Sequence, residues 1–259
     1  LTGDIILPMS ILIRPNTTLA SSTELSRTPL SEQVGRHILE QAAADGLRPG
    51  NILRSEAQLS ADFKVSRPIV REALRWLAGQ GAIEIVNGKG AILCPPSAAQ
   101  LQLYFSYAIT IGQVQFHEIM EARKPIEVQS AVLAAQRRTD HHIEAMESLL
   151  GRMKTHLHNT DTYVDLDLEL HLLIADAAQN MVLAHLIRAI RSTLNTTVHE
   201  SLYKRRNRQQ LEWVHSVHDD LVRAIVLGNA DAAGRAMQMH FDEALTFLNR
   251  QAGQIKRKI

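Results

Sequence analysis

Residues 53–93 constrain the fold of this chain more than any other segment, because their start, stop and turn signals follow a fixed order. Ser55, with Gln58 three residues later, forms a capping box that predicts a helix from about Glu56. Ser66 is a favourable N-cap and predicts a second helix after a short turn. Two short helices joined by a tight turn are typical of a helix-turn-helix.

A two-stranded hairpin is predicted directly after these helices. Asn87 and Gly88 form a dipeptide that strongly favours a tight hairpin turn, and apolar β-branched residues recur on both sides of it. Lys89 lies at the tip of the hairpin, within reach of a DNA phosphate or the minor groove. Helix, turn, helix and hairpin in this order predict a winged helix-turn-helix, whose second helix enters the major groove of DNA.

The second helix carries a basic face. Arg67, Arg71 and Arg75 recur at every fourth position, opposite apolar residues that must face a core. A guanidinium fork binds a phosphate, or the O6/N7 edge of guanine, with two hydrogen bonds. In an isolated helix a solvated face would explain the three arginines equally well. The turn before them and the hairpin after them favour DNA reading.

The segment resembles the GntR family of bacterial regulators. The matches to the family pattern are Leu53, Ser55 and Glu56, then Val65, Ser66 and Arg67, then the run from Val70 to Leu74. The resemblance and the pattern together predict DNA contacts from Arg54, Ser55, Ser66, Arg67, Pro68, Arg71, Gly88 and Lys89. Arg54 replaces the usual proline, and Ala57 stands where many members carry a DNA-contacting basic residue. Arg54 is expected to compensate for that lost contact.

Composition narrows the class of protein further. A formal net charge of +1 excludes a general polyanion binder, so affinity for DNA must come from a local basic patch. The one cysteine, Cys94, excludes an intramolecular disulfide and fits a reducing cytoplasm. No apolar run approaches the roughly 18 residues that cross a bilayer, so no membrane partner is expected.

The chain divides into a DNA-reading part and a helical part at Pro95 and Pro96, because consecutive prolines resist both helix and strand. We expect a flexible extension (1–28), a winged helix-turn-helix domain (29–94), a linker (95–97), an all-α effector-binding domain (98–250) and a basic tail (251–259). Helices of the all-α domain are expected near 98–111, 114–137, 140–157, 161–178, 181–201, 208–227 and 230–250. The predicted fold class is mainly α: three helices and a small β-hairpin wing, followed by an all-α helical bundle.

Four residues of the helical half, one aspartate and three histidines, have spacings that favour a metal site. Asp167 and His171 are four residues apart, so both project from one helix face. His218 lies ten residues before Gly228 and His240 twelve after it, so an antiparallel hairpin places both histidines at nearly the same height. Such a set in a bundle core suits Zn²⁺, Ni²⁺, Fe²⁺ or Mn²⁺. The alternative is that these are unrelated members of the twelve histidines in the chain.

Residues 98–250 resemble the ligand-binding FCD domain of the FadR-type branch of the GntR family. The matching positions are Arg123 with Glu127, Asp167 with His171, His218 with Leu221, Ala224 and Ile225, and finally His240. The resemblance implies the metal-containing subgroup: a divalent ion, Zn²⁺ or Ni²⁺ foremost, on the Asp/His set and a small organic acid held by Arg123. His215 is expected to line the same pocket. Arg123 could instead serve only as the ion-pair partner of Glu127.

The function expected from these features is a transcriptional repressor, not an enzyme. Two chains paired about a two-fold axis would bind a palindromic operator in double-stranded DNA, and an organic acid would shift the placement of the DNA-binding domains. Two alternatives stay open. One is a regulator whose signal is the metal ion itself; the other is a metal-dependent hydrolase, which would leave the winged helix without a role. The sequence does not identify the effector, the operator or the regulated genes.

Overall fold

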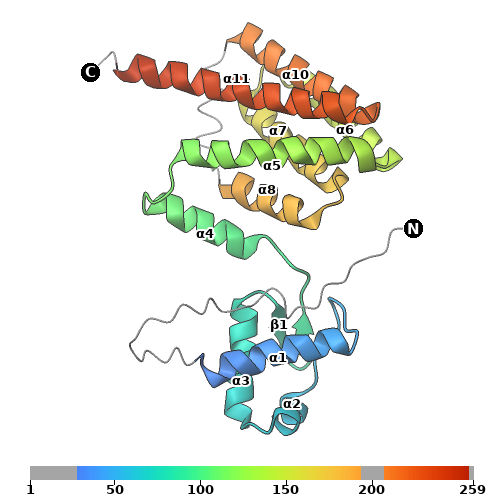
Figure 1. The fold of residues 1–259 in the computed structure, drawn as a ribbon, viewed down its shortest axis with the longest axis vertical. Helices are drawn as coiled ribbons and strands as arrows, with labels where there is room; N and C mark the ends of the chain where they lie inside the picture. The colour runs from blue at the N-terminus through green and yellow to red at the C-terminus, as the bar shows by residue number, and fades with distance from the viewer. Residues whose placement is uncertain (1–27, 194–206, 257–259) are drawn as a thin grey trace, which may run out of the picture.

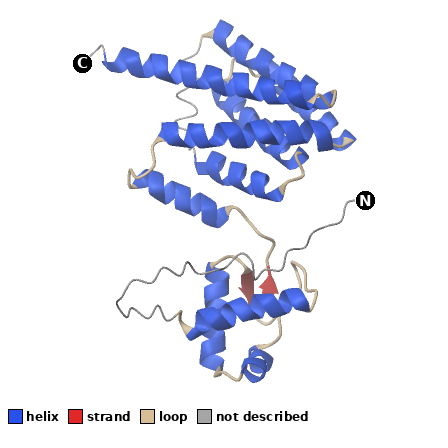
Figure 2. Ribbon diagram, viewed as in Figure 1, coloured by secondary structure: helices blue, strands red, loops and turns tan. Residues whose placement is uncertain are grey.

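The computed structural model describes residues 28–193 and 207–256, and these ranges form two parts (Figure 1). Helices dominate, and the strands within the described ranges form one hairpin in the N-terminal part (Figure 2). The predicted fold class, a winged helix-turn-helix followed by an all-α bundle, is thereby confirmed. Of the expected extension (1–28), all but residue 28 lies outside the described residues.

The N-terminal part contains three helices and the hairpin. These elements are α1 (Leu30–Ala44), α2 (Glu56–Phe63), α3 (Arg67–Gly79), β1 (Ile83–Val86) and β2 (Gly90–Leu93). The Ser55 hydroxyl accepts a hydrogen bond from the backbone N–H of Gln58 at 3.3 Å, and the Gln58 side chain accepts one from the backbone N–H of Ser55 at 2.9 Å. Helix α2 therefore begins with the expected capping box.

One apolar face holds α3 in place. Val70, Ala73 and Leu77 are fully buried and pack in a core shared with α1 and β1. Because these residues recur at helical spacing, their burial turns the three arginines of the helix toward solvent. The wing follows at once: β1 and β2 pair antiparallel, with Ile83 opposite Leu93.

The C-terminal part is a helical bundle. Its described helices are α4 (Ala99–Thr110), α5 (Phe116–Arg137), α6 (Asp140–Thr155), α7 (Thr160–Ala177), α8 (Met181–Thr193), α10 (Arg208–Val226) and α11 (Ala230–Lys256). The helix start at Thr160 follows Asn159, whose side chain accepts a hydrogen bond from the backbone N–H of Thr162 at 3.2 Å. Helix α11 continues past the expected end at residue 250, so part of the expected basic tail is helical, and residues 257–259 lie outside the described residues.

Helix α5 lies at the centre of the bundle and packs against α7, α8, α10 and α11 (Figure 1). Apolar side chains from five helices form one core, which includes Ala131, Met146, Leu170, Leu221 and Phe241. Helices packed around a shared core offer a protected interior in which polar side chains from different helices can meet. Within the described ranges, no helix combines the length and the apolar character that a membrane crossing requires.

A short segment connects the two parts, and a side chain of the bundle forms a hydrogen bond with the N-terminal part. The backbone N–H of Cys94 donates to the carbonyl of Ala82 at 2.9 Å and closes the wing before the two prolines. Gln100, in the first turn of α4, reaches back, and its Nε2 donates to the carbonyl of Gln80 at 2.6 Å. Because Gln80 directly follows α3, the first helix of the bundle contacts the end of the arginine-bearing helix.

The substitution Gly35→Ala tests the packing of α1 on α3. A Cβ at this position would lie 2.8 Å from Cε3 of Trp76, so the indole ring or the helices must shift. We expect the free energy of unfolding to fall by about 1–2 kcal/mol, measured by denaturant titration. The control is Gly79→Ala, where a Cβ meets nothing within 4 Å. That variant should be neutral or gain about 0.5 kcal/mol from helix propensity, and equal effects at both positions would contradict the packing described here.

Candidate functional site

The expected DNA-contacting residues are all exposed, and four of them line one groove of the N-terminal part. Arg54, Ser55, Arg71 and Lys89 line a single groove between α2, α3 and the wing, together with Arg75. The remaining expected residues are exposed at the start of α3 or at the wing tip: Ser66, Arg67, Pro68 and Gly88. The basic face and the wing therefore belong to one surface, as a winged helix requires.

Two acidic contacts modify this basic surface. The Nε atom of Arg71 donates to a carboxylate oxygen of Glu56 at 2.7 Å, which orients the guanidinium across the groove. Arg54 is held by Asp62 at 2.9 Å and by Asp45 at 2.8 Å. The hydrogen bond to Asp62 and the charge of Asp45 raise the pKa of Arg54. Arg54 thus pairs with two carboxylates within its own domain, which the sequence did not indicate.

The helical part brings one aspartate and three histidines together. Asp167 and His171 come from α7, His218 from α10 and His240 from α11, and each offers a ligand atom within 4.8 Å of the others. The Nε2 atom of His218 lies 3.0 Å from Oδ1 of Asp167, and Nε2 of His171 lies 3.7 Å from the same oxygen. The ring of His240 lies 4.6 Å from that of His218, centre to centre. Residues far apart in the sequence therefore converge as their spacing predicts.

A tight turn makes this convergence possible. Gly228 lies between α10 and α11 with a φ angle of 73°, a left-handed conformation that favours glycine. A Cβ there would also lie 2.8 Å from Nη2 of Arg138, whose guanidinium donates to the carbonyl of Val226 at 3.1 Å. The turn folds α11 back along α10, and this brings His218 and His240 to the same level of the bundle.

The cluster is buried and electrostatically suited to a cation. Burial alone would raise the pKa of Asp167, but His171, His218 and Arg191 together hold it well below its usual value. Burial lowers the pKa of His171. Burial and the nearby His218 hold the pKa of His240 well below its usual value, although His240 lies at the partly exposed edge of the cluster. An ionised carboxylate beside neutral imidazoles is the protonation state in which these groups bind a divalent ion.

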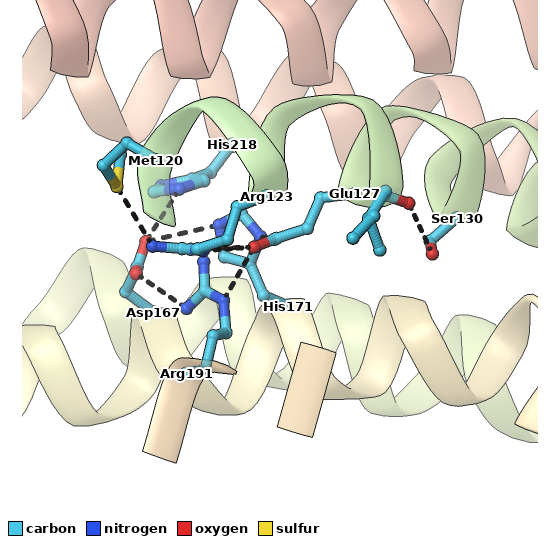
Figure 3. A network of polar contacts seen from close by, with 9 residues as sticks. Met120, Arg123, Glu127, Ser130, Asp167, His171, Arg191 and His218 are labelled. Carbon is cyan, nitrogen blue, oxygen red and sulfur yellow. Dashed lines mark hydrogen bonds and ion pairs between the residues drawn. The ribbon is translucent and has the colours of Figure 1, made fainter. Parts of the chain in front are cut away.

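Glu127 on α5 ties this cluster to two arginines (Figure 3). Its Oε2 contacts Nδ1 of His171, and its Oε1 lies 2.8 Å from the guanidinium of Arg123 and 3.2 Å from Nε of Arg191. Arg191 also places Nη1 3.4 Å from Oδ2 of Asp167. Burial by itself would raise the pKa of Glu127, but the charges of Arg123 and Arg191 hold it well below its usual value.

Arg123 was expected either as an effector anchor or as the ion-pair partner of Glu127, and its position fits both descriptions. Its side chain is 2% exposed, it pairs with Glu127, and its guanidinium lies 5.2 Å from the ring centre of Phe241, the neighbour of His240. Burial lowers its pKa, and the charge of Glu127 opposes that effect. Arg123 thus belongs to the same polar network as the Asp/His cluster.

His215 lies beside the cluster but not in it. Its ring is half-buried and lies 6.3 Å from that of Tyr163, whose hydroxyl lies 3.3 Å from Nδ1 of His218. Burial and the nearby His218 lower the pKa of His215. Its Nδ1 is buried and makes no hydrogen bond within the described residues.

Sequence reasoning missed Arg191 and the contact of Glu127 with His171. Glu127 was marked only as four residues from Arg123, and nothing in its spacing relates it to α7. No sequence pattern indicated that Arg191 is buried, because an arginine near the end of a helix is usually solvent-exposed. Here its side chain is 2% exposed and faces α5 and α7.

The chain matches two known sequence families. Residues 30–93 match the bacterial regulatory proteins of the gntR family, and residues 118–243 match the FCD domain. The HTH-type transcriptional regulator LutR of Bacillus subtilis is 31% identical over 196 residues, which span 75% of this chain and 90% of LutR. This chain belongs to the GntR family. It combines the DNA-binding domain of that family with an FCD domain, in the FadR-type branch that the sequence resembles.

Further relatives match most of this chain. The Uxu operon regulator of Haemophilus influenzae is 28% identical over 88% of this chain and 85% of its own length. The HTH-type transcriptional repressor NanR of Escherichia coli K12 is 27% identical over 85% of each chain. The solved structure of Streptococcus agalactiae GntR superposes with a TM-score of 0.57 at 23% identity, covering 82% of this chain and 97% of that one, which supports the fold. The chain is therefore a DNA-binding transcriptional regulator and not an enzyme.

The substitution Glu127→Ala tests the buried network. It leaves two buried guanidinium groups without their shared carboxylate, so we expect the free energy of unfolding to fall by about 3–5 kcal/mol. The control is Glu169→Ala, which removes a surface pair with Arg152 in which both side chains are 54% exposed. That change should cost less than about 1 kcal/mol. A similar midpoint shift for both variants in denaturant titration would mean that Glu127 does not organise the bundle.

Proposed function

We propose that this chain is a repressor whose binding to operator DNA is controlled by a small carboxylate bound beside a divalent metal ion. The observation that carries the proposal is that one chain joins an arginine-lined winged helix to a buried Asp/His cluster with an arginine network. The relative NanR is named a repressor, which supports this polarity. The protein acts where operator DNA is, in the bacterial cytoplasm.

In this proposal α3 lies in the major groove and the wing lies over the backbone or the minor groove. Arg67 and Arg71 contact bases or phosphates, with Ser66 and Pro68 at the start of the helix. Because Glu56 occupies Nε of Arg71, the terminal nitrogens of that guanidinium are the ones left to read guanine. The supporting contacts come from the remaining exposed residues of the surface: Arg54, Ser55, Gly88 and Lys89.

We propose that two copies of the chain bind a palindromic operator. Helix α4 supports this proposal because it exposes Leu103 at 71%, Tyr104 at 62% and Tyr107 at 62%, next to Ile111 at 48%. Contiguous exposed apolar side chains mark surfaces that associate, and a two-fold pairing buries the same patch on both chains. Such a dimer presents two α3 helices to two half-sites of DNA.

The four clustered residues fit a divalent ion. The Nε2 atom of His171 is buried and makes no hydrogen bond in the part of the chain that the structure describes, which is costly unless a ligand satisfies it. When Nδ1 carries the proton in both rings, His171 donates to Glu127 and His218 donates to the hydroxyl of Tyr163. The unprotonated Nε2 atoms of both histidines then face Asp167. One carboxylate and three imidazoles favour Zn²⁺ or Ni²⁺. When bound, the ion would supply positive charge that attracts and orients a carboxylate.

The carboxylate is held by residues of the polar network. Arg123 is already buried beside the cluster and offers a planar fork that matches a carboxylate group. His215 adds a nitrogen without a hydrogen-bond partner among the described residues. A carboxylate that binds Arg123 would replace contacts that Arg123 otherwise makes with neighbouring side chains such as Glu127.

The effect of the ligand reaches the DNA-binding domain through α8 and α4. Arg191 on α8 contacts Glu127 and Asp167, and α8 packs along α4. Gln100 on α4 donates to the carbonyl of Gln80 at the end of α3. Control requires that the ligand bind two placements of these helices with different affinity.

One alternative remains, a regulator for which the ion itself is the signal. Ligands from three helices in a buried cluster favour a tightly held ion and therefore the organic-acid signal. Operator binding measured with Zn²⁺ alone and with Zn²⁺ plus acid separates the two. Release of DNA by the metal alone would favour the metal-sensing alternative.

The proposal is tested first by selecting binding sites from random duplex DNA. We expect a short palindrome whose affinity falls steeply with salt, because several phosphates are contacted by each chain. Failure of the folded full-length protein to enrich any sequence would reject the proposed operator binding.

The substitution Arg71→Ala should weaken binding to the selected operator by roughly tenfold, because it removes a contact worth about 1–3 kcal/mol. The bundle should remain folded, as judged by circular dichroism. The matched control is Arg223→Ala, which removes the same charge from the surface of α10, where Arg223 pairs with Asp219. Equal affinities for both variants would mean that α3 does not read the operator.

The substitution His240→Ala should lower both the metal content and the thermal stability of the protein, because one of four ligands is lost and metal affinity contributes to folding. Metal content is measured by elemental analysis after dialysis against metal. The control is His141→Ala, an exposed histidine at the start of α6. Unchanged metal content and melting temperature in the His240 variant would reject the site.

A further inference from the structure

The cations of the groove between α2, α3 and the wing differ in their carboxylate partners. Arg71, Arg75 and Lys89 line the groove, and Glu56, in the first turn of α2, carries the only carboxylate among the described residues of this lining. The Nε atom of Arg71 donates to Oε2 of Glu56 at 2.7 Å. Arg75 and Lys89 form no ion pair within the residues that the structure describes. Arg54 holds two carboxylates and adds no net positive charge.

The pair with Glu56 weakens the attraction of Arg71 for a phosphate. A guanidinium and a carboxylate at hydrogen-bond distance have a net charge of zero, so together they attract an anion less than a free arginine does. A phosphate on Arg71 would also lie next to the carboxylate of Glu56. Ile52 and Ile85 line the same groove, so DNA that covers it excludes water and strengthens this repulsion. Like charges placed together in an interface are strongly unfavourable.

A base edge makes a different demand on Arg71. The O6 and N7 atoms of guanine are neutral acceptors, and they require two N–H donors rather than a net positive charge. A guanidinium has five N–H donors, and Glu56 takes the one on Nε. The two terminal nitrogens remain for an end-on contact with guanine, and the carboxylate can stay in place during that contact.

We infer that Glu56 makes Arg71 a reader of guanine, whereas Arg75 and Lys89 bind phosphates. Glu56 is thus a positioning residue that sets the specificity of DNA binding through Arg71. The inference rests on the proposed function, in which α3 lies in the major groove, and it assigns a separate contact to each cation there. It also gives a role to Arg75, which the expected set of DNA-contacting residues does not include.

The salt dependence of binding distinguishes the two kinds of contact. Each phosphate contact contributes about 0.9 to the slope of log affinity against log salt, whereas a base contact contributes specificity. Affinities of the full-length protein are measured by fluorescence anisotropy between about 50 and 200 mM KCl. The probes are the operator selected from random DNA and a duplex with the same base composition in scrambled order.

Arg71→Ala and Arg75→Ala should have different effects. Arg71→Ala should weaken operator binding about tenfold, weaken binding to the scrambled duplex less than about twofold, and leave the slope unchanged. A repeated selection with this variant should no longer recover guanine at one position of each half-site. Arg75→Ala should weaken binding to both duplexes by the same factor and reduce the slope by about 0.9 for each chain bound.

Glu56→Gln tests the carboxylate itself. Glutamine keeps an oxygen that can accept from Nε of Arg71, but it removes the negative charge. We expect binding to the scrambled duplex to tighten by about threefold to tenfold, with a slope steeper by about 0.9 for each chain, while operator binding changes less. The preference for the operator therefore falls. Circular dichroism and melting curves establish that the variant is folded.

The matched control is Glu72→Gln. It removes the same charge from an exposed position of α3, where Glu72 forms no ion pair with any described residue. Binding to the scrambled duplex should change less than about twofold, because an exposed charge without a close partner is largely screened by salt. Equal effects of Glu56→Gln and Glu72→Gln would reject the role of Glu56, since any lost negative charge would then act alike.

The outcomes separate this inference from the proposal on which it rests. If the folded protein enriches no sequence, the proposed operator binding is wrong and the inference falls with it. If an operator is found and Arg71→Ala weakens both duplexes by the same factor with a smaller slope, Arg71 binds a phosphate. The inference is then wrong, and the proposed function stands.

Discussion

A shared carboxylate at the centre of the bundle is the interaction on which the helical part depends. Glu127 on α5 contacts His171 on α7 and Arg191 on α8, and it also pairs with Arg123 of its own helix. Charged groups in a protein interior are tolerated when each has its partner, and they destabilise the fold when one partner is lost. The network therefore restricts how α5, α7 and α8 can pack against one another. Hydrophobic contacts alone would restrict this packing less.

The same network lies next to the Asp/His cluster that could hold a metal ion. Asp167 has one oxygen toward the histidines and the other toward Arg191, so the cluster and the arginine pair share a group. Arg191 on α8 therefore contacts an oxygen of a residue that belongs to the cluster. Since α8 packs on α4, and α4 contacts the end of α3 through Gln100, the fold offers a continuous path from the buried site to the DNA-binding domain. The proposed regulation uses this path. It requires that these helices have two alternative positions, whose equilibrium the ligand shifts.

Much of this arrangement could be predicted because the signals are local or periodic. The capping box at Ser55 and the hairpin dipeptide at Asn87 depend only on neighbouring residues, and both elements begin where predicted. The convergence of His218 and His240 followed from their similar distances to a glycine turn, ten and twelve residues, which is a matter of helix geometry. The ion pairs of Arg54 could not be predicted in this way, because both carboxylates come from other segments and no local pattern indicates them.

The sequence by itself determined the mainly helical fold class, the position of the arginine-bearing helix and the identity of the four clustered residues, because helix periodicity and turn chemistry depend on short stretches of chain. Only the tertiary structure decided that Arg191 is buried and that Glu127 joins three helices. The physical reason is that ion pairs between helices depend on how those helices pack. Packing is set by the whole core, and sequence spacing within one helix says nothing about the side chains of another.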